Sequence, residues 1–331
     1  MTRVVIVGAT GNVGTSLIEA LAAEPSVDEI IGVARRVPTA QLDVRWVAAN
    51  IEHADLVPIF RGADSVVHLA WRIQPAHDLL SLRTTNVTGS ARVFAAAAEA
   101  GVKSLVYASS VGAYSWGPKD RRVDESWPTA GTSSSFYARH KSEVERLLDQ
   151  FETEHPEVRV VRLRPGLIFK RTSAEEQVRY FLGPLFPRVL AQPSAIPIIP
   201  DIPGLRFQVV HADDVADAYR RAVVGNDARG AFNVASEPVV DADVLAALLS
   251  ARKVPVPVGV ARRAMALTWR LRLQPTPPGW LDMGLAVPLM DTTRARRDLG
   301  WEPKDSSVGT IRELLTGIRE RADEPTPALA G

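Results

Sequence analysis

The chain has 331 residues, 46% of them apolar, which is enough to bury roughly 75% of its unfolded surface and excludes a mainly disordered protein. Because 39 Lys and Arg are balanced by 38 Asp and Glu, no global field favours nucleic acid or a membrane as a partner. The absence of cysteine excludes disulfides, thiolate metal sites and thiol nucleophiles.

The first apolar run begins at Val4 and meets Gly8 too early for a signal peptide or a spanning helix. We therefore expect a soluble protein, and the lack of cysteine favours a cytoplasmic location.

Short apolar, β-branched segments alternate with helical patterns through the first half of the chain. The predicted strands are Arg3–Gly8, Glu29–Arg35, Val44–Asn50, Ser65–Trp71, Ser104–Ser110 and Val158–Arg164. The predicted helices between them include Asn12–Ala23, Val87–Ala100 and Ser135–Phe151. Because the strands are nearly continuous in apolar residues, both faces of the sheet should be covered. The pattern predicts an α/β protein with a doubly wound parallel sheet, the Rossmann arrangement.

The composition changes after Arg164. Six of the 24 prolines fall between Pro184 and Pro203 and six more between Pro255 and Pro288, which favours loops and short helices over sheet interior. Between these regions, Phe207–Val210 and Gly230–Ala235 have strand character. We predict a Rossmann domain over residues 1–169, rejoined by about 207–235. Residues 170–206 and 236–320 would form a smaller, mostly α substrate-binding lobe, and 321–331 a disordered tail.

A glycine-rich loop joins the first strand to the first helix, with the sequence Gly8-Ala9-Thr10-Gly11-Asn12-Val13-Gly14. Glycines permit a tight turn and let backbone N–H groups approach a pyrophosphate, while the helix N-terminus supplies partial positive charge. The order strand, loop, helix is that of a dinucleotide site. The predicted cofactor contacts in this loop are Gly8, Thr10, Gly11, Asn12, Val13 and Gly14.

The end of the second strand distinguishes the two nicotinamide cofactors. An NAD(H) site places a carboxylate there for the ribose 2′-hydroxyl, but this chain has Arg35 and Arg36. Two guanidinium groups suit a 2′-phosphate, so NADP(H) is favoured over NAD(H); two solvated surface arginines are the alternative. Asn50 and Ile51, at the end of the third strand, are predicted to flank the adenine.

A tyrosine and a lysine four residues apart provide the candidate chemistry. Tyr137 and Lys141 lie on one face of a predicted helix, and Ser109-Ser110 ends the fifth strand, at the edge where open α/β sheets bind ligands. A free phenol has a pKa near 10, and a nearby ammonium together with an oxidised nicotinamide would lower it. Tyr137 would then exchange protons at neutral pH.

These motifs together resemble the extended short-chain dehydrogenase/reductase family, the group of NAD-dependent epimerases and dehydratases. The matching segments are the glycine loop, His68-Leu69-Ala70, Asn86-Val87-Thr88-Gly89, Ser110 before Tyr114, Tyr137 with Lys141, Arg164-Pro165-Gly166, Val210 to Val215, Phe232 to Ala235 and Leu299 to Pro303. The resemblance covers nearly the whole chain.

The resemblance implies a role for each matched residue. Ser110 would hold the substrate oxygen, Tyr137 would exchange its proton, and Lys141 would bind the nicotinamide ribose and lower the pKa of Tyr137. Further cofactor contacts implied in the same way are Leu69, Ala70, Pro165 and Gly166. The family also implies a homodimer.

One segment departs from the pattern of members that act on nucleotide sugars. Leu167 to Arg171 stands where those members have an Asn-containing loop that ends in Gly-Pro. In the following lobe, apolar residues form either an apolar substrate pocket or an ordinary small core. These residues are Phe181, Leu182, Leu185, Phe186, Leu190, Ile196, Ile198 and Ile199.

Other polar clusters have simpler interpretations. The six histidines show no metal-binding spacing, so no metal is predicted. His211 with Asp213 and Asp214 is expected to begin a helix. The arginines around Trp269 form either a solvated helix face or a contact with a phosphate or membrane surface.

The leading hypothesis is an NADPH-dependent reductase of a ketone or aldehyde, with Tyr137 as the proton donor. The first alternative is an epimerase or dehydratase, such as one acting on a sugar nucleotide, that returns the hydride to the same molecule. The second alternative is a non-catalytic sensor of NADP(H), which would need no proton donor. The expected partner is a small carbonyl substrate.

Overall fold

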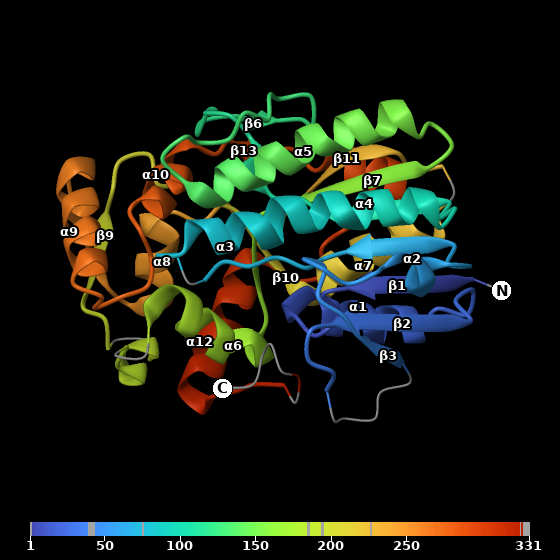
Figure 1. Ribbon diagram of the computed structural model, residues 1–331. Helices are drawn as coiled ribbons and strands as arrows, with labels where there is room; N and C mark the ends of the chain where they lie inside the picture. Colours follow the sequence, from blue (N-terminus) through green and yellow to red (C-terminus); the bar gives the residue numbers. More distant parts are fainter. Residues whose placement is uncertain are drawn as a thin grey trace.

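The computed structural model describes residues 2–38, 44–74, 76–183, 186–192, 195–225, 227–324 and 326. A seven-stranded sheet forms its centre (Figure 1), with every neighbouring pair of strands parallel. In spatial order its strands are β3 (Arg45–Ala48), β2 (Glu29–Ala34), β1 (Arg3–Val7), β4 (Ser65–His68), β5 (Ser104–Ala108), β7 (Arg159–Pro165) and β11 (Gly230–Val234). The order reverses at β1, so the crevice for a ligand opens beside the carboxyl end of this strand.

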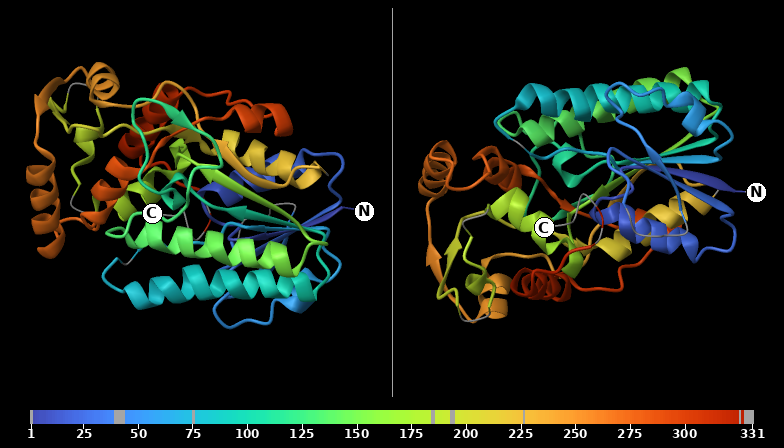
Figure 2. Two further views of the ribbon diagram at one scale, coloured as in Figure 1. Left: turned by 90° about the horizontal axis from the view of Figure 1, so that it is seen from above. Right: turned by 60° about the horizontal axis from the view of Figure 1, so that its bottom comes forward.

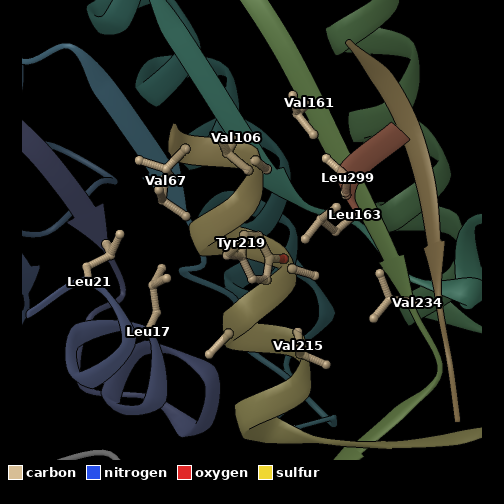
Figure 3. Close-up of a cluster of buried hydrophobic side chains, with 14 of the residues drawn as sticks. Leu17, Leu21, Val67, Val106, Val161, Leu163, Val215, Tyr219, Val234 and Leu299 are labelled. Carbon is tan, nitrogen blue, oxygen red and sulfur yellow. The ribbon is translucent and has the colours of Figure 1, made fainter. Parts of the chain in front are cut away.

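Helices cover both faces of the sheet, as the right-hand view in Figure 2 shows. One layer contains α1 (Asn12–Ala22), α7 (Ala212–Val224) and α11 (Thr293–Leu299), and the other α2 (Val57–Phe60), α4 (Gly89–Glu99) and α5 (Phe136–Glu154). Successive residues of β1 alternate between two buried clusters: Val4 and Ile6 pack with α1 and α7, and Val5 and Val7 with the opposite layer. Figure 3 shows the first cluster. The predicted fold class is confirmed.

The remaining elements form a smaller lobe and three short parallel strand pairs, β8 with β10, β9 with β12 and β6 with β13, except that α3 continues through a π-helical turn into α4 (Figure 1). The elements are α3 (Leu79–Arg83), β6 (Arg122–Val123), β8 (Leu167–Phe169), α6 (Ala174–Gln177), β9 (Ile198–Asp201), β10 (Val209–His211), α8 (Ala242–Leu249), β12 (Arg252–Pro255), α9 (Val258–Arg270), α10 (Gly279–Ala286), β13 (Leu289–Met290) and α12 (Ser307–Glu320). Single turns of 3-10 helix lie at Val111–Ala113, Arg171–Ser173 and Arg188–Ala191, and π-helical turns at Thr84–Thr88 and Val178–Leu182. The chain in β10 returns beside β8 rather than into the main sheet.

Two segments of the last third of the chain pack against earlier parts of the chain. Helix α11 and the fully buried Trp301 pack under the sheet with α7, so this part of 236–320 belongs to the Rossmann core. In the tail, the Glu324 carboxylate lies 2.5 Å from Lys170 Nζ, and Thr326 Oγ1 donates to the Thr10 carbonyl at 3.0 Å. These two residues of the predicted tail are held by contacts with residues far away in the sequence.

His211 is the N-cap of α7, where its Nδ1 accepts a hydrogen bond from Asp213 N at 3.2 Å, as predicted. Of the helices in the described ranges, none combines the length and the apolar composition needed to cross a bilayer.

Candidate active site

The glycine loop wraps closely around the end of β4. Gly8 has φ +91°, and a Cβ there would lie 2.6 Å from Ala70 N. A Cβ on Gly14 would lie 2.6 Å from the carbonyl oxygens of Gly8 and Ala9. Gly11, in contrast, has room: a Cβ would meet only the Gly8 oxygen, at 3.6 Å. The first and third glycines therefore permit close packing, and the second leaves a cradle at the N-terminus of α1 that fits a pyrophosphate.

A cavity of about 580 Å³ extends from this loop into the smaller lobe. Eleven of the predicted site residues line it: Gly8, Gly11, Asn12, Val13, Gly14, Leu69, Ser110, Tyr137, Lys141, Pro165 and Gly166. The backbone at Gly166 lies close to the backbone at Gln208, since a Cβ on Gly166 would lie 2.4 Å from the Gln208 carbonyl oxygen. Residues from five separate stretches of sequence thus meet at one site.

Six predicted cofactor contacts lie outside the cavity wall: Thr10, Arg35, Arg36, Asn50, Ile51 and Ala70. Ile51 is buried, and a Cβ on Gly89 would meet its side chain at 2.8 Å, so it packs in the core. Asn50 Oδ1 accepts a hydrogen bond from Glu52 N. Arg35 and Arg36 are exposed just after β2.

Tyr137 and Ser110 meet at the centre of the cavity wall. The Tyr137 side chain is partly exposed toward the cavity, yet burial raises the pKa of its hydroxyl to about 12, opposed by a hydrogen bond with Ser110. The Ser110 hydroxyl also accepts a hydrogen bond from Gly112 N at 3.0 Å. The hydrogen bond with Ser110 therefore opposes the effect of burial on the pKa of Tyr137.

Lys141 is a buried cation held by aromatic rings. Its Nζ lies 3.5 Å from the centre of the Trp71 ring and donates a hydrogen bond to the Ala108 carbonyl at 2.6 Å. Burial lowers its pKa well below the ordinary value, and the nearby Glu145 carboxylate opposes this effect. Among the described residues the ammonium makes one hydrogen bond of the three it can donate, so it can still bind a ribose hydroxyl.

A buried charge network behind Lys141 stabilises the site. Glu145 accepts hydrogen bonds at 2.9 Å from both Arg162 and Arg164, which lie on β7, and at 2.5 Å from the Ser109 hydroxyl. Burial alone would raise the pKa of Glu145, but the hydrogen bonds and charges of the two arginines hold it at about 2. The network joins helix α5, which carries Tyr137 and Lys141, to the central strands.

The part of the cavity beyond Tyr137 has an aromatic and aliphatic wall. The centre of the Trp280 ring lies 5.0 Å from the centre of the Tyr137 ring and 5.1 Å from the centre of the Phe181 ring. Other residues of this wall are Trp71, Ile73, Leu182, Leu205, Phe207 and Met283. Of the lobe residues predicted for such a pocket, Phe181 and Leu182 line it, whereas Phe186 packs in a separate small core. Leu185 lies outside the described residues.

The fold and the site define the extended short-chain dehydrogenase/reductase class. Residues 4–235 match the model of the NAD dependent epimerase/dehydratase family, which is more than half of the chain. The chain belongs to that family.

Three similar proteins illustrate its range. An uncharacterised protein of Mycobacterium tuberculosis H37Rv, Rv0501, is 26% identical over 95% of this chain and 83% of its own length. The L-arabinose 1-dehydrogenase (NAD(P)(+)) of Haloferax volcanii is 36% identical over 33% of this chain and 41% of its own length. The structure of the UDP-glucose 4-epimerase of Thermotoga maritima with UDP-glucose covers 97% of this chain and 99% of its own, with TM-score 0.70 and 20% identity. The chain is thus similar to proteins named for dehydrogenation and for epimerisation.

Proposed function

We propose that the protein is an NADP(H)-dependent reductase of an apolar ketone or aldehyde. The observation that carries this proposal is the group of Ser110, Tyr137 and Lys141 at one cavity that runs from the glycine loop to an aromatic wall. The cofactor, when bound at the glycine loop, supplies hydride to the carbonyl carbon.

The residues of the chain control the oxygen of the substrate. The Ser110 hydroxyl holds the carbonyl oxygen, and Tyr137 donates its proton to that oxygen as the carbon is reduced. Burial raises the pKa of the phenol to about 12, so its hydroxyl carries a proton at neutral pH, and positive charge beside the ring favours transfer of that proton. Lys141 holds the ribose and places positive charge beside the reacting groups.

The charge of the cavity wall favours an apolar substrate over a nucleotide sugar. Lys141 and Glu176 are the charged residues among those that line the cavity. A nucleotide sugar carries a diphosphate, which needs cationic or multiple N–H partners when it leaves water. Because Lys141 belongs to the catalytic group, the outer wall offers aromatic rings and aliphatic side chains instead.

The preference for NADP(H) is supported by the position of Arg35. The residue is exposed and directly follows β2, where an NAD(H) site would place a carboxylate. An arginine at this place can reach a ribose 2′-phosphate. We also predict that the protein forms a homodimer and is located in the cytoplasm.

The alternative of an internally returned hydride is supported by the NAD dependent epimerase/dehydratase family of the chain and by the similarity of its fold to the Thermotoga epimerase. Net oxidation of NADPH in the presence of an aryl ketone or aldehyde separates the two functions, because an epimerase returns its cofactor unchanged.

The test compares Tyr137→Phe with Tyr180→Phe, which removes a hydroxyl from the same cavity. Tyr137→Phe should lower single-turnover reduction by about 10²–10⁴ and leave NADPH affinity nearly unchanged. Tyr180→Phe should retain turnover within an order of magnitude of the wild type. Near-normal turnover in Tyr137→Phe would show that the proton comes from another group.

A further inference from the structure

Helix α9 presents apolar side chains to solvent. The helix lies at the outer end of the smaller lobe, far from the sheet, in Figure 1 and in both views of Figure 2. Val260, Leu267 and Leu271 are 53%, 58% and 60% exposed, and none of the helix residues is buried. Spacings of seven and four residues place these three on one stripe, which is the reverse of an ordinary surface helix.

Basic residues border the stripe, and two of them are paired with acids: Lys253 with Asp243 and Arg262 with Asp282. Between Arg252 and Leu281 the chain has six basic residues and no acidic one. Arg262 forms two hydrogen bonds with Asp282 and ties α9 to α10. Arg263, Arg270 and Arg272 are exposed, and among the described residues no carboxylate lies within salt-bridge distance of them. Exposed apolar and cationic groups therefore alternate on one surface.

The combination of exposed apolar side chains and arginines indicates which kind of partner binds to α9. A second copy of the chain would place arginines against arginines, because a symmetric contact brings the same surface together twice. A surface with aliphatic side chains between unpaired arginines is typical of helices that lie at the boundary between lipid head groups and acyl chains. A single convex helix at the end of a molecule can also reach a flat surface. We propose that α9 and the following Leu271–Leu273 segment dock on an anionic lipid bilayer.

The inner side of α9 connects this surface to the substrate cavity. The rings of Trp269 and His77 are stacked with centres 4.4 Å apart. His77 lies in the loop after β4 that carries Trp71 and Ile73 of the cavity wall. In the same loop, Gln74 donates hydrogen bonds to the carbonyls of Tyr180 and Pro275. The bilayer contact thus lies beside the chamber that takes an apolar substrate.

The net charge of the whole chain does not reveal this local basic surface. A net charge of +1 predicts no attraction to a membrane, but that sum includes acids on distant elements. Exposed charges separated by more than a Debye length, about 8–10 Å, are screened from one another, so the local charge decides.

The experiment is vesicle flotation of the full chain. Phosphatidylcholine vesicles are compared with vesicles of phosphatidylcholine and phosphatidylglycerol in equal parts. Wild-type protein should float with the anionic vesicles, and less so at high salt. A triple variant, Arg263→Gln with Arg270→Gln and Arg272→Gln, should bind about 100-fold more weakly, from roughly fivefold for each arginine.

Two further variants test the apolar stripe. Leu267→Glu with Leu271→Glu should abolish flotation, whereas Leu80→Glu, at a site that is 77% exposed on α3, should float like the wild type. All variants should keep the thermal unfolding temperature and NADPH affinity of the wild type, since α9 does not line the cofactor cavity. Wild-type protein that stays unbound to anionic vesicles overturns the proposal, and binding of polyglutamate in its place would indicate an acidic protein partner. Flotation needs no turnover, so its failure is distinguishable from failure of the proposed reductase activity.

Discussion

Replacing Glu145 with alanine should lower the free energy of unfolding by about 3–5 kcal/mol. The substitution leaves Arg162 and Arg164 buried without their shared anion, and removing one partner of a buried ion pair has costs of this size. The pKa of Glu145, about 2 against an ordinary 4.5, independently corresponds to about 3 kcal/mol at neutral pH. This stabilisation is present above about pH 4.5 and is lost as the pH falls toward 2, because the folded-state pKa is the lower one.

The control is Asp149→Ala, which removes another carboxylate that contacts Arg162. Asp149 lies 2.7 Å from that guanidinium, but its side chain is 65% exposed, so solvent screens the pair and the loss should be about 1 kcal/mol or less. Urea denaturation at neutral pH, followed by far-ultraviolet circular dichroism, measures both variants. If Glu145→Ala is no less stable than Asp149→Ala, the buried network does not hold α5 on the sheet.

Three other substitutions have defined outcomes. Arg35→Ala with Arg36→Ala should reduce the preference for NADPH over NADH by roughly ten- to a hundredfold in cofactor titrations, because charge-assisted bonds to a 2′-phosphate are lost; equal affinities in the wild type would contradict this. Lys141→Met should raise the free energy of unfolding, since it removes a buried cation whose pKa is already depressed, while single-turnover reduction falls; a loss of stability would show that the cation stabilises the fold. Gly166→Ala should cost about 1–3 kcal/mol because its Cβ would lie 2.4 Å from the Gln208 oxygen, whereas Gly259→Ala, with open space around it on α9, should be neutral or slightly stabilising in the same urea titration.

Local sequence determined the features whose cause is local. Continuous apolar segments predict strands buried on both faces, and three glycines after the first strand predict a tight turn at a helix N-terminus. Tyr137 and Lys141 are four residues apart on one helix, so their common face follows from helical geometry. Each of these patterns depends on backbone conformation over a few residues, and each was therefore visible without the tertiary structure.

The tertiary structure decided which distant residues meet. Trp71 lies against Lys141, and Glu145 on α5 joins two arginines on β7, contacts for which no spacing along the chain gives a signal. Periodicity also identifies the apolar side of a helix without saying what that side faces. The stripe on α9 has the spacing of a core-facing helix, but Leu267 and Leu271 are exposed, whereas Trp269 of the same helix stacks on His77. Side-chain contacts between elements depend on how distant parts of the chain pack together. For this reason the aromatic wall of the cavity and the exposed stripe on α9 with its arginines could be identified only from the tertiary structure.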